Sequence, residues 1–170
     1  MKDQQTLDQQ QTKTQEIIMK VETLREVLHW TSEFHQHLKE CLKRGADKTE
    51  NTRAQMLLNY LSEHEEKLGH AVHQFEVTGN EHALNTWCYE YFDKNPIVQH
   101  HHCDAPFAEL STNDIMQIII HQHQQIIDLY RYLHDRADID SAKELMEELR
   151  SFEEHEMMVM SQSANRLEDI

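Results

Sequence analysis

Residues 54–75, which read AQMLLNYLSEHEEKLGHAVHQF, decide the fold class. Their apolar side chains recur three or four positions apart, the spacing that places side chains on one face of an α-helix. This stripe consists of Ala54, Leu58, Leu61, Leu68, Val72 and Phe75. Glu65 stands on the same stripe between Leu61 and Leu68, so a carboxyl group takes a core position. The stretch predicts an amphipathic helix that buries an acid.

Three more stripes of this period predict three more long helices. They comprise Ile17, Val21, Leu24, Leu28, Leu38 and Leu42, then Ile115, Ile119, Ile126, Leu129 and Leu133, and finally Leu145, Leu149, Phe152, Val159 and Leu167. Glycine often follows the last residue of a helix, so Gly45 and Gly79 predict where the first two helices end. With 3 Gly and 2 Pro in 170 residues, the chain lacks the turn residues of a β-sandwich or barrel. We therefore expect an all-α, four-helix up-down bundle.

The links between the stripes divide the bundle into two hairpins. The links after the first and third helices are short, so residues 16–78 and 111–168 are each predicted to form an antiparallel helical hairpin. Residues 79–110 contain both prolines and are predicted to cross over along the length of the bundle, with a short helix at 83–92.

Composition limits the location and the partners of the chain. Residues 1–15 are rich in Gln and almost free of apolar side chains, which predicts a disordered tail before a single domain at 16–170. No run approaches the roughly 18 apolar residues of a membrane span, and the tail lacks the apolar core of a signal peptide, so we expect a cytoplasmic protein. The formal net charge of −15 disfavours nucleic acid and anionic membranes as partners. Cys41, Cys88 and Cys103 have no CxxC spacing and are expected to be free thiols.

The two predicted hairpins resemble each other in sequence. An offset of 91 positions brings eight identities together between residues 38 and 68, and it places Glu63-His64-Glu65 on Glu154-His155-Glu156. This match predicts an internally duplicated hairpin in which Glu65 corresponds to Glu156. Both acids stand on apolar stripes, and we expect them to face each other across the bundle interior.

Two related hairpins joined by a long crossover resemble the ferritin-like superfamily, and its rubrerythrin-like branch in particular. The resemblance implies a bundle that commonly pairs into a homodimer. It also implies a di-iron centre built from one Glu on each of two helices and a Glu-x-x-His pair on each of the other two. Glu65 and Glu156 match two of the six ligands. The other four positions hold Thr31, Leu68, Gln122 and Val159.

Other ligands gather at the level of the two acids, so an altered site for Fe, Mn or Zn remains an alternative. Its candidate metal ligands are Glu65, Glu156, His35, His64 and His155. The other alternative is a metal-free polar layer in which the two acids, Gln122 and Thr31 satisfy one another, with at least one acid protonated or paired with His35. The missing ligands favour a non-catalytic bundle that acts through protein contacts. The acids in the core favour a metal-binding oxidoreductase or metal-handling protein, and whether the chain is an enzyme stays open.

Two features of the crossover and its surroundings remain. The run His100 to Cys103 is interpreted as a polar loop, with zinc or nickel binding as the alternative. Trp30, Trp87 and the aromatic residues between 89 and 92 are interpreted as a small core beneath the crossover, with a dimer surface as the alternative.

Overall fold

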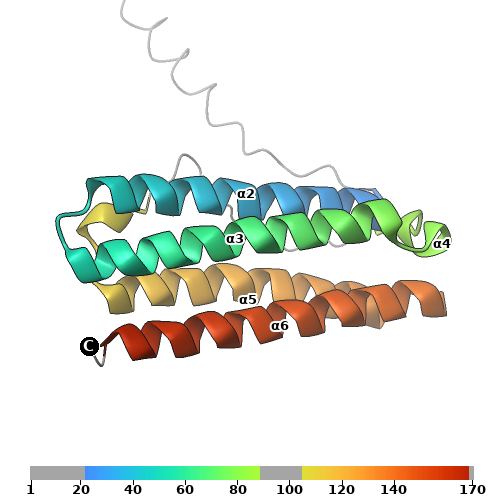
Figure 1. Cartoon of the computed structure of the whole chain (residues 1–170). Helices are drawn as coiled ribbons and strands as arrows, with labels where there is room; N and C mark the ends of the chain where they lie inside the picture. Colours follow the sequence, from blue (N-terminus) through green and yellow to red (C-terminus); the bar gives the residue numbers. More distant parts are fainter. Residues whose placement is uncertain (1–21, 89–104, 169–170) are drawn as a thin grey trace, which may run out of the picture.

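The computed structural model describes residues 22–88 and 105–168 and confirms the all-α class (Figure 1). Four long helices lie side by side, with a short α-helix and one 3-10 turn between them. In chain order these are α2 (Leu24–Lys48), α3 (Thr52–Thr78), α4 (Glu81–Leu84), η2 (Phe107–Glu109), α5 (Thr112–Arg136) and α6 (Asp140–Glu168). Within the described segments no strand is formed, and Thr23 and Trp87 make an isolated β-bridge.

Short polar side chains fix the starts of three of the long helices. Thr23 precedes α2 and forms a capping box with Glu26, in which each side chain bonds to the backbone of the other residue. Asn51 precedes α3 and accepts from two backbone N–H groups, and Ser111 precedes α5 and accepts from the backbone N–H of Asp114. The hairpin links therefore fall close to their predicted places.

The two predicted helix ends have different outcomes. Gly79 follows the last residue of α3 and donates its backbone N–H to the carbonyl of Phe75 at 2.9 Å, as predicted. The prediction for Gly45 is wrong, because α2 continues through it to Lys48. A Cβ at this position would lie 2.7 Å from the Cβ of Phe107, so the glycine allows η2 to approach α2.

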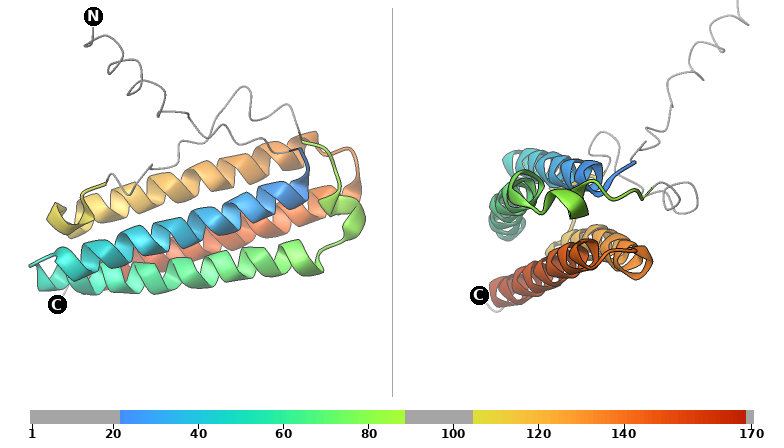
Figure 2. Two further views of the ribbon diagram at one scale, coloured as in Figure 1. Left: turned by 90° about the horizontal axis from the view of Figure 1, so that it is seen from above. Right: turned by 90° about the vertical axis from the view of Figure 1, so that its right-hand side faces the viewer.

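The colours in Figure 1 show the direction of each helix. The chain runs one way in α2 and α6 and the opposite way in α3 and α5. The connection from α3 to α5 must therefore span the length of the bundle. Of the short helix expected at 83–92, only residues 83 and 84 are helical, as the end of α4 (Glu81–Leu84); residues 85–88 are not helical, and residues 89–92 lie outside the described residues. Viewed from the end, α2, α3, α6 and α5 take successive corners of the bundle (Figure 2).

The two hairpins correspond at an offset of 88 positions. Helices α2 and α5 each contain 25 residues, and their first residues, Leu24 and Thr112, are 88 positions apart. The first residues of α3 and α6 have the same separation. Many buried positions of α2 recur in α5 at this offset, beginning with Val27 and Ile115. The predicted offset of 91 is therefore wrong by three positions, a rotation of about 60° around a helix.

The remaining sequence predictions concern the cysteines, the segments outside the described residues, and membrane spans. Cys88 is a partly buried free thiol, but Cys41 is disulfide-bonded, so the expectation of free thiols is wrong for Cys41. The segments 1–21 and 89–104, which include the predicted tail and the run from His100 to Cys103, lie outside the described residues. Each helix of the described segments is too short or too polar to cross a membrane.

Candidate metal centre

Four ionisable side chains, one from each long helix, meet in the middle of the bundle. They are His35 on α2, Glu65 on α3, His123 on α5 and Glu153 on α6, and each is 0% exposed. We call these four residues the quartet. Charged groups are almost never fully buried without partners, because burial removes their hydration.

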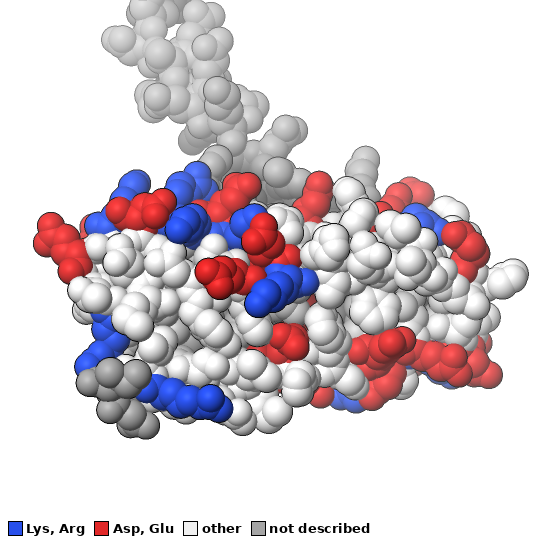
Figure 3. Space-filling view, viewed as in Figure 1, with Lys and Arg blue, Asp and Glu red and all other residues white. Residues whose placement is uncertain are grey.

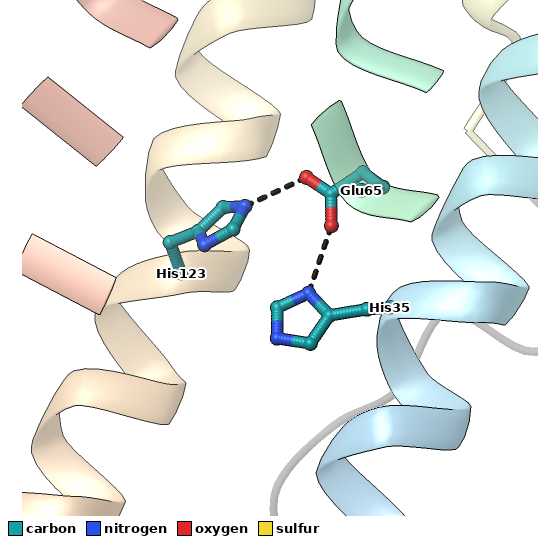
Figure 4. Close-up of side chains that lie close together, drawn as sticks. All are labelled: His35, Glu65 and His123. Atoms are coloured by element: carbon teal, nitrogen blue, oxygen red, sulfur yellow. Dashed lines mark hydrogen bonds and ion pairs between the residues drawn. The ribbon is translucent and has the colours of Figure 1, made fainter. Parts of the chain in front are cut away.

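The quartet is a closed ring in which imidazoles and carboxylates alternate. Nδ1 of His35 lies 2.8 Å from Oε2 of Glu65, whose Oε1 lies 2.8 Å from Nε2 of His123. Nδ1 of His123 lies 3.0 Å from Oε2 of Glu153, whose Oε1 lies 2.9 Å from Nε2 of His35. Every nitrogen and every carboxylate oxygen of the four side chains thus has a partner. Figure 4 shows half of this ring, with one oxygen of Glu65 directed at each imidazole.

The packing around the quartet holds its imidazoles in place. The rings of His35 and His123 lie side by side with centroids 5.5 Å apart, and Phe34 packs edge-on against His35 at 5.6 Å. On the α3 side, a Cβ at Gly69 would lie 3.2 Å from the Cβ of His35, so glycine lets α3 approach α2 closely. The hydroxyl of Ser32 on α2 donates a hydrogen bond of 2.8 Å to the carbonyl of Gly69, which stabilises the close packing of the two helices.

The mutual charges in the ring determine its protonation. Burial alone would lower the pKa of each histidine, but the carboxylates outweigh it and raise the pKa to about 9 for His35 and about 10 for His123. Burial alone would raise the pKa of each acid, but the imidazolium charges lower it to about 2 for Glu65 and Glu153. At neutral pH the metal-free ring therefore holds two imidazolium and two carboxylate groups, with no net charge.

Further polar groups lie buried near this ring. Thr31 and Gln122 are buried as the polar-layer alternative predicts, but they do not satisfy the acids, because the Thr31 hydroxyl donates to the carbonyl of Val27 at 2.8 Å and Glu65 bonds to the two histidines. Burial, followed by the nearby charge of Glu153, raises the pKa of Tyr130 well above its usual value of 10. The hydroxyl of Tyr130 and Oε1 of Gln122 have no partner that meets hydrogen-bond geometry. The centre of the bundle is thus polar beyond the quartet itself.

Three quartet residues fit a single metal ion. Ligand atoms of His35, Glu65 and His123 all lie within 4.8 Å of one another, close to the span of about 4 Å between opposite ligands of one ion. Two imidazoles and a carboxylate suit Fe, Mn or Zn. Glu153 contacts the other nitrogen of each histidine, the place where a carboxylate commonly orients a histidine ligand. The residues present therefore fit one ion, and they do not reproduce the six-ligand di-iron pattern.

The structure separates the five predicted ligands into two groups. His35 and Glu65 lie in the quartet, and Glu153, rather than Glu156, is the acid across the interior from Glu65. Glu156 is instead 20% exposed and contacts His64, with 2.5 Å between Oε2 and Nε2. His155 is exposed on α6. The prediction that Glu156 faces Glu65 is wrong because three positions rotate the side chain about 60° away from the core.

Sequence reasoning missed His123 and Glu153. The predicted apolar stripe of α6 runs through Phe152, one position before Glu153, and so leaves Glu153 out. The missed signal is the offset of 88, which places His35-Gln36 on His123-Gln124 and Glu65-Glu66 on Glu153-Glu154.

Comparison with known proteins adds no assignment, because no family model, curated protein or solved structure significantly matches this chain.

Proposed function

We propose that this chain is a metal-binding helical bundle that holds one divalent transition-metal ion, Fe²⁺, Mn²⁺ or Zn²⁺. His35, Glu65 and His123 would bind the ion, and Glu153 would orient the two imidazoles. The single observation that carries the proposal is the convergence of two imidazoles and two carboxylates, one from each helix, at positions with no solvent exposure.

Charge balance supports this proposal. One divalent cation can replace the two acidic protons of His35 and His123 while the net charge of the site stays at zero. Each histidine then binds through one nitrogen and donates its remaining N–H to Glu153. The bundle can therefore exchange protons for metal without leaving an uncompensated charge in its core.

The burial of the site favours retention of an ion over rapid turnover of a substrate. All four side chains are 0% exposed, and the cavity of about 340 Å³ beside η2 is lined by residues such as Arg44, Lys48 and Phe107, none of them from the quartet. Catalytic metal sites usually keep a position open for water or substrate. Metal storage, delivery or a structural metal fits these residues better than an oxidoreductase.

We also propose that the chain is a divergent ferritin-like bundle that arose by duplication of a helical hairpin. The offset of 88 in helix starts and buried positions supports duplication. The helix directions and the long connection from α3 to α5 support the ferritin-like assignment (Figure 1).

A metal-free bundle that acts through protein contacts is the second candidate. The closed ring favours it, because the quartet satisfies its own charges and hydrogen bonds without a cation. A homodimer and a cytoplasmic location stay predictions. Trp87, which is 70% exposed, supports the dimer surface.

Calorimetric titration of the chelator-treated full chain with Zn²⁺ separates the two candidates. The metal-binding proposal predicts one ion per chain, lost in Glu65→Gln and kept in the control Glu66→Gln. Glu66 is the adjacent residue on α3, but its side chain is 57% exposed and bonds to Lys39. Absence of binding to the parent chain, or equal binding by both variants, would refute the proposed site.

A further inference from the structure

A cation can reach the quartet only by passing between helices, because all four side chains are 0% exposed. The seam between α2 and α3 is closely packed at Gly69, where a Cβ would lie 3.2 Å from both the Cβ of His35 and the carbonyl oxygen of Ser32. On another side of His35, Phe34 packs against the imidazole, and Trp30 packs against Phe34 at 5.6 Å. Packed groups fill both places, with Nε2 of Gln36 only 2.7 Å from a Cβ at Gly69 and the two aromatic rings beside His35.

The seam between α3 and α6 carries a partly exposed polar pair, His64 and Glu156, near the level of the quartet. His64 immediately precedes Glu65, and Glu156 lies one turn after Glu153. Their side chains are 13% and 20% exposed, and Nε2 of His64 lies 2.5 Å from Oε2 of Glu156. Despite this short distance, Nε2 of His64 has no partner that meets hydrogen-bond geometry. The pair is therefore partly exposed, holds a buried imidazole nitrogen with a free coordination position, and adjoins two quartet residues along α3 and α6.

The neighbours of this pair differ on its two sides. On one side the ring of Tyr60 packs against His64 at 5.5 Å, and its hydroxyl donates to Oγ of Ser163 at 3.0 Å. On the other side Phe75 and Phe152 close the seam, with ring centroids 6.5 Å apart. Polar contacts thus begin at the His64–Glu156 pair and continue away from the two phenylalanines.

The chemistry of the pair suits a metal in transit. Imidazole and carboxylate bind the same divalent ions as the quartet, and two protein ligands hold an ion less firmly than three. The negative charge of the chain raises the local concentration of cations. Figure 3, viewed as in Figure 1, shows acidic side chains towards the right-hand end of the lower edge, where α6 begins, and basic side chains at the left-hand end.

We propose that His64 and Glu156 form a relay site, which takes up a divalent transition-metal cation from solvent and passes it to His35, Glu65 and His123. This inference rests on the proposed metal-binding function. In the relay, His64 and Glu156 replace part of the hydration shell of the cation before Glu65, His35 and His123 receive it. The relay affects the rate of loading and leaves the final site unchanged.

Stopped-flow mixing of the chelator-treated full chain with Co²⁺ tests the relay, because the visible absorption of bound Co²⁺ reports loading directly. The variants are His64→Phe, which keeps a ring beside Tyr60, and Glu156→Gln. Glu76→Gln is the control, because Glu76 pairs with His73 at 3.1 Å on the same helix and is 15% exposed. We expect both relay variants to load at least ten-fold more slowly than the parent and the control, with the same final absorbance and one Co²⁺ per chain.

The outcomes distinguish the relay from the function on which it rests. Equal loading rates with full final absorbance would overturn the relay and leave the metal site standing. Loss of equilibrium binding in either relay variant would also overturn it, because that residue would then be a ligand of the final site. A parent chain that binds no Co²⁺ at equilibrium would refute the proposed function and the relay together.

Discussion

Replacing Glu153 with leucine should destabilise the metal-free bundle more than any exposed substitution on α6. Glu153→Leu removes the acceptors that lie 2.9 Å from Nε2 of His35 and 3.0 Å from Nδ1 of His123. It leaves two imidazolium groups and one carboxylate, a net positive charge at positions with 0% exposure. Removing one partner of a buried ion pair lowers the free energy of unfolding by about 3–5 kcal/mol. For a domain of this size, that loss lowers the melting temperature by about 6–20 °C.

A charge-balanced variant tests the reasoning behind this magnitude. The double substitution His123→Leu/Glu153→Leu removes one positive and one negative charge and keeps the His35–Glu65 pair, whose atoms lie 2.8 Å apart. We expect the double variant to be more stable than Glu153→Leu alone, because removal of a complete buried pair is often close to neutral. Urea denaturation at pH 6.5 with a chelator measures both, with Glu148→Leu as an exposed control on α6. A loss below about 1 kcal/mol for Glu153→Leu, or a double variant less stable than the single, would refute the charge-balanced quartet.

Three further predictions concern the same centre. The lowered pKa of Glu65 and Glu153 means that these acids contribute fully to the free energy of unfolding above about pH 4.5 and lose that contribution towards pH 2. The raised pKa of His35 and His123 means that these histidines contribute fully below about pH 6.5 and lose that contribution as the pH rises through 9–10. Urea unfolding of the chain with a chelator should therefore give a larger free energy of unfolding at pH 5.5 than at pH 9.5. The same free energy of unfolding at both pH values would contradict these pKa directions. Metal binding at pH 7 should release two protons per ion, which calorimetry in buffers of different ionisation enthalpy measures, and release of none would show that the histidines are neutral before binding. Gly69→Val should lower the free energy of unfolding by about 1–3 kcal/mol, because its side chain would meet the Cβ of His35 and the backbone of Ser32, and a fully stable variant would show that α2 and α3 can separate freely.

The fold class could be predicted from the sequence because apolar spacing alone specifies amphipathic helices. The stripe from Ala54 to Phe75 locates α3, and Gly79 marks its end. Gly45 misled the prediction because a glycine inside a helix and one after a helix look the same in a sequence. Only the contact with Phe107, which lies 62 positions further along the chain, shows that Gly45 serves close packing.

The candidate site could be predicted only in part. Glu65 and His35 follow from their places on apolar stripes, and both lie in the quartet. His123 and Glu153 were missed because the apolar stripes tolerate a shift of one to three positions, whereas a buried ring requires the rotation of each helix to be correct. The neighbouring acids Glu153, Glu154 and Glu156 are chemically equivalent in a sequence, and only helix packing decides which of them is buried.

The metal content of the full chain, purified without a histidine tag or a nickel column, tests the central claim most directly. Elemental analysis of the parent chain should find about one Fe, Mn or Zn per chain, and the same analysis of His123→Gln should find almost none. His121→Gln is the matched control, because His121 lies two positions away on α5 and is exposed. A parent chain without stoichiometric metal, or a His123→Gln variant that retains it, would contradict the account.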